Sequence, residues 1–157
     1  ETIEPPIALL LFGGGLDACP LVKFGHELGW YVQVVDPDPA RANKGRFPLA
    51  DAVVVSRTEQ LAERVIVDRR SAALVMTHHP DQDRGILAFL RESPAGYIGV
   101  APRDYDPKLL SEEAAAGPAD EGRVFVPAGL QIGAFTAHET SVAVIAEIIR
   151  RFSGATA

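Results

Sequence analysis

A glycine-rich stretch, FGGGLDACP, follows the first apolar run of the chain and contains residues suited to binding a phosphate. Gly13, Gly15 and Ala18 match the pattern G-x-G-x-x-G/A of dinucleotide-binding turns. Glycine permits a tight turn and a close backbone approach, so amide groups from Gly14 to Leu16 and the following helix N-terminus can face an anion. The stretch predicts a phosphate site. The alternative is a strand-to-helix turn that binds nothing.

Acidic residues lie on either side of this predicted site, and Asp17, in the first turn of the following helix, would repel a phosphate. Asp36 ends the second apolar run, near the spacing of roughly 20 residues at which an acid binds a ribose hydroxyl. Asp38 adds a second negative charge, so a 2′-phosphate would be repelled and NADH would bind better than NADPH. The alternative is that the DPDP sequence is a turn that ends the strand. The basic stretch 41–46 could grip a phosphate or balance the two aspartates.

A histidine pair stands at the carboxyl end of the fourth apolar run. In the strand order 3-2-1-4-5-6, this run neighbours the first at the topological switch point, where ligands bind. The imidazole of His78, beside Thr77, could donate to a phosphate, act as an acid or base, or hold a metal, with Asp83 as an orienting partner. A turn or capping histidine is the alternative. We therefore expect a pocket between the glycine turn, residues 13–16, and Thr77 with His78. Cys19 is expected to pack as a small apolar residue.

Short apolar runs that alternate with helical patterns must position these groups. The predicted strands span residues 7–12, 31–35, 52–55, 72–76, 96–100 and 124–126. The predicted helices span residues 16–28, 59–69, 81–92, 108–115 and 137–152. Nearly continuous apolar strands indicate a parallel sheet covered on both faces. The sequence therefore predicts an α/β fold, a Rossmann-like doubly wound parallel sheet of about six strands in three layers.

Two helix starts contain capping-box patterns, Ser56 with Glu59 and Thr136 with Glu139. The last helix has an apolar stripe that is expected to face the sheet, with Glu147 off it. The stripe consists of Val142, Ile145, Ile148, Ile149 and Phe152.

Composition limits the classes of function. The 157 residues are about one domain long, so residues 1–157 are predicted to form a single domain. A net charge of −6 argues against nucleic acid as a partner, and no apolar run approaches the roughly 18 residues of a membrane span. One cysteine and an N-terminus without signal-peptide features predict a cytoplasmic setting. Because the chain begins with Glu rather than Met, we expect it to be part of a longer polypeptide.

Motifs of several enzyme classes are missing from the sequence. There is no Y-x-x-x-K pair, G-x-S-x-G, H-E-x-x-H, C-x-x-C or Walker loop. A hydride-transfer enzyme would also need a second region to hold its substrate. A binding module is therefore favoured over a catalyst, and no catalytic residue or metal ligand is predicted.

Five blocks, in this order, resemble the C-terminal Rossmann domain of the XdhC/CoxI family, accessory proteins of molybdenum hydroxylases. The blocks are PPIALLLFGGGLDACPLV, LGWYVQVVDPDPARANKGRFPLADAVVV, VMTHHPDQD, YIGVAPR and VPAGLQIGAFTAHETSVAVIAEII. The family's N-terminal region is absent from this chain. At two places the chain departs from the family pattern: Ala101 stands before Pro102 where a glycine is usual, and Gln131 replaces an Asp.

The resemblance implies a chaperone more than a catalyst. Such a domain would bind molybdenum cofactor, help its sulfuration with a cysteine desulfurase, and deliver it to an apo-hydroxylase of the xanthine dehydrogenase or CO dehydrogenase type. A homodimer is a further expected form. The cofactor-binding residues would be Gly13, Gly14, Gly15, Leu16, Asp36, Thr77, His78, Arg103, Gly129, Gln131 and Gly133. The alternatives are an NAD(P)(H)-binding sensor, half of an oxidoreductase, or a structural domain used for dimerisation or docking.

Overall fold

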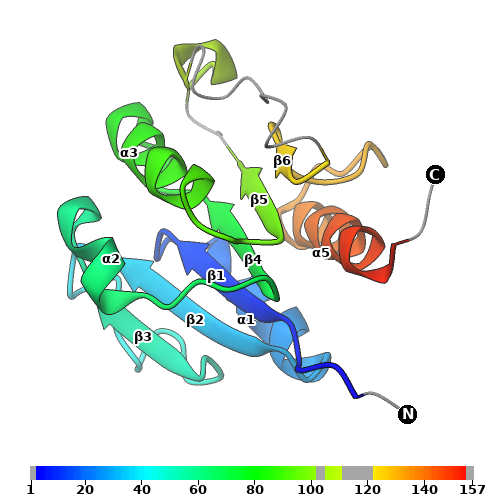
Figure 1. Cartoon of the computed structure of the whole chain (residues 1–157), viewed down its shortest axis with the longest axis horizontal. Helices are drawn as coiled ribbons and strands as arrows, with labels where there is room; N and C mark the ends of the chain where they lie inside the picture. Colours follow the sequence, from blue (N-terminus) through cyan, green and yellow to red (C-terminus); the bar gives the residue numbers. More distant parts are fainter. Residues whose placement is uncertain (1–2, 102–104, 111–121, 155–157) are drawn as a thin grey trace.

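The structure, a computed structural model, describes residues 3–101, 105–110 and 122–154. Its centre is a parallel sheet with the strand order β3-β2-β1-β4-β5-β6 (Figure 1). The strands are β1 (Ala8–Phe12), β2 (Tyr31–Asp36), β3 (Ala52–Val55), β4 (Ser71–Val75), β5 (Tyr97–Val100) and β6 (Val124–Phe125). Each lies within about a residue of its predicted range. The predicted order 3-2-1-4-5-6 is confirmed.

Helices cover both faces of the sheet, which makes the fold Rossmann-like with three layers. The α-helices are α1 (Ala18–Glu27), α2 (Leu61–Arg64), α3 (Pro80–Arg91) and α5 (Ala137–Ser153). Two short 3₁₀ helices, η1 (Thr58–Gln60) and η2 (Pro107–Leu110), lie in the connections. No helix among these described residues is long and apolar enough to cross a membrane.

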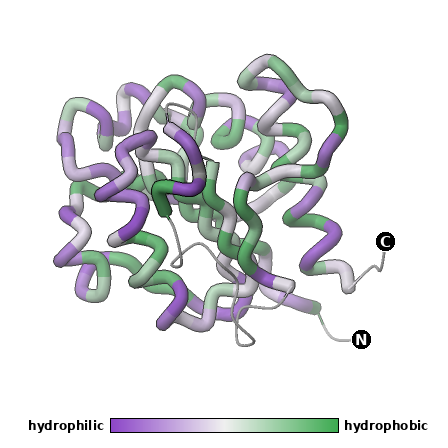
Figure 2. Tube along the Cα trace, turned by 90° about the horizontal axis from the view of Figure 1, so that it is seen from above, coloured by the Kyte–Doolittle hydropathy of each residue, from purple (hydrophilic) through white to green (hydrophobic). Residues whose placement is uncertain are grey.

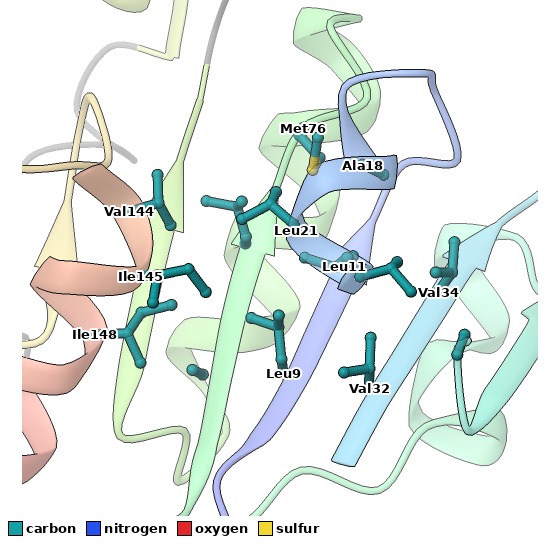
Figure 3. Close-up of a cluster of buried hydrophobic side chains, with 14 of the residues drawn as sticks. Leu9, Leu11, Ala18, Leu21, Val32, Val34, Met76, Val144, Ile145 and Ile148 are labelled. Atoms are coloured by element: carbon teal, nitrogen blue, oxygen red, sulfur yellow. The ribbon is translucent and has the colours of Figure 1, made fainter. Parts of the chain in front are cut away.

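The alternating side chains of the central strands divide the core into two clusters. Leu9 and Leu11 of β1 point to the face covered by α1 and α5, where Leu21 and Ile148 pack on them (Figure 3). Leu10 and Phe12, which alternate with them along β1, point to the other face, under α2 and α3. Figure 2 shows hydrophobic strands in the middle of the molecule and hydrophilic residues concentrated in the surrounding loops and helix surfaces. Because both faces are covered, the central strands need no polar side, as their sequences indicated.

Several local predictions need correction. The helix predicted over 59–69 is shorter, because α2, which follows η1 directly, ends at Arg64. Ser56 does not cap it: its hydroxyl donates to the Arg57 carbonyl, and the Gln60 side chain accepts from the Arg57 amide. The segment predicted as helix over 108–115 begins as η2, and residues 111–115 lie outside the described part.

The last helix begins as predicted, and its predicted apolar stripe is buried at Ile145 and Ile148 but not along its whole length. The capping box of Thr136 and Glu139 is confirmed, with the Glu139 amide 3.1 Å from Thr136 Oγ1. Val142 and Ile149, predicted to face the sheet, are exposed, whereas Glu147 is buried. Glu147 is tolerated there because the hydroxyl of Tyr97 donates to it at 2.7 Å.

Candidate functional site

The glycine turn joins β1 to α1 at the carboxyl edge of the sheet, and its first two glycines contact the protein's own backbone. Gly13 has a φ of +130°, and a Cβ atom there would lie 2.5 Å from the carbonyl oxygen of Met76. A Cβ atom on Gly14 would lie 2.9 Å from the carbonyl oxygen of Arg41. These two positions need glycine for close packing of β4 and of the segment after β2, whether or not a phosphate binds.

The part of the turn that remains open is Gly15 with Leu16. A Cβ atom on Gly15 would meet only the carboxylate of Asp17, and the Leu16 side chain is exposed. Among the described residues, no acceptor is found for the amide groups of Gly15 and Leu16. These two amides at the start of α1 are therefore the part of the predicted phosphate site that can still face an anion.

Asp36 stabilises the glycine turn from the end of β2. Its carboxylate accepts from the Gly14 amide and from the Asp38 amide, each at 2.8 Å, and only 5% of the residue is exposed. Arg46 donates to the Gly14 carbonyl at 3.0 Å from the other side. Both carboxylate oxygens of Asp36 thus already accept backbone bonds, and its expected bond to a ribose hydroxyl stays a prediction.

The residues after β4 form a turn that sends successive side chains in different directions. His78 has a φ of +65°, a left-handed conformation that is uncommon outside glycine. Its Nε2 atom lies 2.6 Å from Oδ2 of Asp17, the N-cap residue of α1. The two side chains are 14% and 15% exposed. The imidazole thus contacts Asp17 and not Asp83, the residue expected to orient it.

Asp83 is instead the buried acceptor for the residue before His78. Its Oδ1 atom accepts from the amide and the hydroxyl of Thr77, at 3.1 and 2.5 Å. Its Oδ2 atom accepts from the hydroxyl of Tyr105 at 2.6 Å. Burial and this bond to Asp83 raise the pKa of the Tyr105 hydroxyl well above its ordinary value.

A cavity of about 280 Å³ opens beside the Asp17–His78 pair, between α1, the ends of β4 and β5, and the start of α5. Apolar side chains form most of its wall, and Asp17 with His78 supply charge-bearing groups. The lining residues are Asp17, Leu21, Leu74, Met76, His78, Ala101, Pro127, Ala128, Phe135, Ala137, Thr140, Ser141 and Val144. Of the predicted cofactor-binding residues, His78 alone is among these described lining residues.

A second hollow, of about 210 Å³, lies on the other side of the His78 turn. Asp36, Asp38 and Arg41 line it from the end of β2, and Thr77 with Gln82 line it from the turn and α3. The left-handed backbone at His78 therefore separates two hollows, because His78 faces the first while Thr77 faces the second.

The remaining predicted residues fall in the loop after β6 or outside the described part. The Gly129 amide donates to the buried carboxylate of Glu147 at 2.9 Å, and its φ is +107°. Gly129 and Gln131 line a shallow groove beside β6, which shares Pro127 with the cavity at His78 but is otherwise lined by other residues. Gly133 is exposed in the same loop. Arg103 lies outside the described residues.

Sequence reasoning missed two contributions to the cavity. Asp17 stood out only as a negative charge at a helix start, yet it contacts His78 across 61 positions of sequence. Thr140 and Ser141 at the start of α5 line the cavity, whereas the polar sequence TAHETS indicated only a capping box. Cys19 is partly buried and packs against the core cluster under α1, as predicted. The described residues contain no group of three or more His, Cys, Asp or Glu side chains that could hold a metal ion.

Comparisons with known proteins show which family the chain resembles. Residues 9–148 match the family model described as the XdhC Rossmann domain. The chain is 35% identical over 151 residues to a probable xanthine dehydrogenase subunit of Bacillus subtilis, covering 96% of this chain and 44% of that protein. It is 28% identical over 145 residues to the "Uncharacterized protein YqeB" of Escherichia coli, covering 90% of this chain and 27% of that protein.

A solved structure shares the fold. The crystal structure of a xanthine dehydrogenase from Bacillus halodurans superimposes with a TM-score of 0.84 at 29% sequence identity. The match covers 98% of this chain and 44% of that chain. The chain thus spans less than half the length of the relatives it matches.

Proposed function

Because the chain belongs to the XdhC family and contains its Rossmann domain, we propose that it acts in the maturation of a xanthine dehydrogenase-type molybdenum hydroxylase. In this proposal the domain holds molybdenum cofactor, receives it for sulfuration together with a cysteine desulfurase, and passes it to the apo-hydroxylase. The cofactor is cargo here. The single observation that carries the proposal is the cavity beside the Asp17–His78 pair at the switch point of the sheet.

The dimensions of the cavity suit one end of such a cargo. Small-molecule sites span roughly 300 to 1,000 Å³, so about 280 Å³ suits a fused ring system better than a whole nucleotide. Leu21, Met76 and Val144 offer apolar surface to the faces of a flat ring. A carboxylate such as Asp17 accepts from neighbouring N–H groups, and a pterin edge presents such groups. The residues present therefore fit a pterin.

The phosphate of the cargo would lie outside the cavity, at the open part of the glycine turn. The amides of Gly15 and Leu16 and the N-terminus of α1 favour an anion there. The Asp17 carboxylate is at the same helix start, and its Oδ2 atom contacts the imidazole of His78. Bound cofactor supplies the molybdenum centre that the hydroxylase uses. The residues of this chain bind it, orient it and shield it from water.

A docking surface for the hydroxylase is part of the proposal. Phe135 lines the cavity, yet 93% of it is exposed, and Ile132 in the same loop is also exposed. Large apolar side chains at the rim of a binding site favour contact with a partner protein. The hydroxylase would cover this rim while the cofactor moves from one protein to the other.

The proposal is tested by retention of molybdenum cofactor. We expect the domain, purified from cells that make the cofactor, to retain pterin, read as fluorescence after oxidative release. Asp17→Leu and His78→Leu should each lower retention by about 10- to 100-fold, because each leaves a buried polar partner unpaired and removes a ligand contact. Asp81→Asn is the control, because the Asp81 side chain is 95% exposed, away from the cavity. Equal retention by all four proteins, or none by the wild type, would refute the proposal.

The second hollow favours a second candidate function, binding of a nucleotide such as NAD(H). Asp36 and Asp38 provide carboxylates at the end of β2, where an acid contacts ribose in dinucleotide-binding folds. Titration with NADH in the absence of pterin decides between the candidates. Tight NADH binding without pterin retention would favour a sensor or a redox domain over the cofactor chaperone.

A further inference from the structure

The turn at His78 has a backbone conformation that the surrounding residues must hold in place. Among the described residues, His78 is the one non-glycine residue with a positive φ. A left-handed residue of this kind costs about 1–2 kcal/mol relative to the right-handed form. Such a conformation persists only when its neighbours fix it, and it occurs often at binding sites. The residues that fix His78 therefore determine where its imidazole points.

The first turn of α3 fixes the residues on both sides of His78. Before His78, the amide and the hydroxyl of Thr77 donate to Oδ1 of the fully buried Asp83 side chain. After His78, the carbonyl of His79, the N-cap of α3, accepts a main-chain bond from the amide at position 83, at 2.9 Å. Thr77 Oγ1 also accepts from the His79 amide at 3.2 Å. These bonds hold both ends of the His78 backbone, while its imidazole is left to contact Asp17.

The second oxygen of Asp83 connects this turn to the chain after β5. The Tyr105 hydroxyl donates to Oδ2, and Arg84, the next residue of α3, donates to the carbonyl of Leu109 at 2.6 Å. A buried carboxylate is stable when several donors share its charge. Asp83 accepts from three donors, two on Thr77 and one on Tyr105, so two separate segments of the chain set its position.

We propose that Asp83 is a positioning residue for the cavity: through Thr77 it holds His78 in the left-handed conformation that brings the imidazole to Asp17. The proposal rests on the proposed function for its ligand, because the cavity at His78 is the site whose affinity Asp83 would set. Supporting residues around a binding group commonly change affinity by about 10- to 100-fold when replaced. Asp83 itself does not line the cavity among the described residues.

Four variants separate positioning from simple loss of stability. Asp83→Ala should weaken retention of molybdenum cofactor by about 10- to 100-fold. Asp83→Asn should restore most of it, because the amide oxygen still accepts from Thr77 and the amide N–H can donate to the Tyr105 oxygen. Thr77→Val, which removes one of the two Thr77 donors, should fall between them. In a His78→Asn background, where asparagine tolerates the left-handed backbone, Asp83→Ala should change retention by less than about 2-fold.

A readout without ligand makes the test independent of the proposed function. The ring nitrogens of His78 can be followed by NMR, since the chain has only four histidines. Asp83→Ala should move the His78 ring resonances toward those of exposed histidines, as the contact with Asp17 is lost. Glu147→Ala is the matched control, because Glu147 is also a buried carboxylate bonded to a tyrosine, yet it anchors Gly129. It should leave the His78 resonances in place.

The outcomes are distinct. If the wild type retains no cofactor, the proposed function fails and the NMR measurement still decides whether Asp83 positions His78. If Asp83→Ala does not fold, Thr77→Val carries the same test with a smaller shift. Unchanged His78 resonances in a folded Asp83→Ala or Thr77→Val protein would overturn the proposal. An equal loss of retention in the wild-type and His78→Asn backgrounds would also overturn it.

Discussion

Replacing single glycines of the turn by alanine tests whether Gly13 serves the fold and Gly15 the ligand. At Gly13, the added Cβ would lie 2.5 Å from the carbonyl oxygen of Met76 and 3.0 Å from the amide nitrogen of Thr77, and the φ of +130° disfavours any side chain. At Gly15, the added atom would meet only Oδ1 of Asp17, at 2.7 Å, so the carboxylate that contacts His78 through Oδ2 would have to shift slightly. Gly13→Ala should therefore lower the stability of the fold much more than Gly15→Ala.

The expected loss for Gly13→Ala has two parts. The backbone strain costs about 1–3 kcal/mol and the overpacking against β4 about another 1–3 kcal/mol. The free energy of unfolding should therefore fall by about 2–6 kcal/mol, and each kcal/mol lowers Tm by about 2–4 °C for a chain of this size. Gly15→Ala should lower the free energy of unfolding by less than about 1 kcal/mol, because one side-chain carboxylate, and no backbone atom, lies close to the added Cβ.

Gly29→Ala provides the control for backbone strain alone. Gly29 has a φ of +76°, and nothing lies within 4 Å of an added Cβ. Its loss should be about 1–2 kcal/mol, the cost of a left-handed alanine. Urea unfolding followed by circular dichroism measures all three variants. If Gly13→Ala is no less stable than Gly29→Ala, the close contact between the glycine turn and β4 adds nothing to the strain, and the reasoning is refuted.

Three further predictions follow from other contacts. Tyr97→Phe removes a donor to buried Glu147, so the free energy of unfolding should fall by about 1–3 kcal/mol in urea unfolding; no change would mean that Glu147 finds another donor. The pKa of the Tyr105 hydroxyl is raised in the folded state, so the stability that this group contributes is complete below its unfolded pKa of about 10 and is lost as the pH rises above that value. Tyr105→Phe should therefore flatten the fall of Tm with pH above about 10, and equal slopes in the two proteins would contradict the Asp83 contact. NADPH should bind about 5- to 150-fold more weakly than NADH, because the carboxylates at the end of β2 repel a 2′-phosphate, and isothermal titration with equal affinities would contradict this.

The arrangement of strands could be predicted from the sequence because each strand is a short apolar run buried on both faces. The parallel order also followed, since alternating strands and helices joined by right-handed crossovers leave few topologies. Helix ends without strong capping signals were predicted less well, as the short α2 shows. The buried face of α5 was predicted correctly at Ile145 and Ile148 and wrongly at Val142 and Ile149, because nothing in the sequence distinguishes these apolar residues from one another.

The candidate site was only partly predictable. His78 could be found because the end of a central strand at the switch point is a ligand site in folds of this kind. Its contact with Asp17 could not, because the left-handed backbone at His78 decides where the ring points, and the sequence THHPDQD does not encode that conformation in any recognised way. The same holds for Glu147, whose burial depends on donors from β5 and from the loop after β6.

The most direct measurement of the central claim is a structure of this domain loaded with molybdenum cofactor. The account predicts a pterin in the cavity beside the Asp17–His78 pair, between α1 and the start of α5, with its phosphate at the amides of Gly15 and Leu16. A cofactor seated only in the hollow at Asp36 and Thr77, or on the groove beside β6, would contradict it.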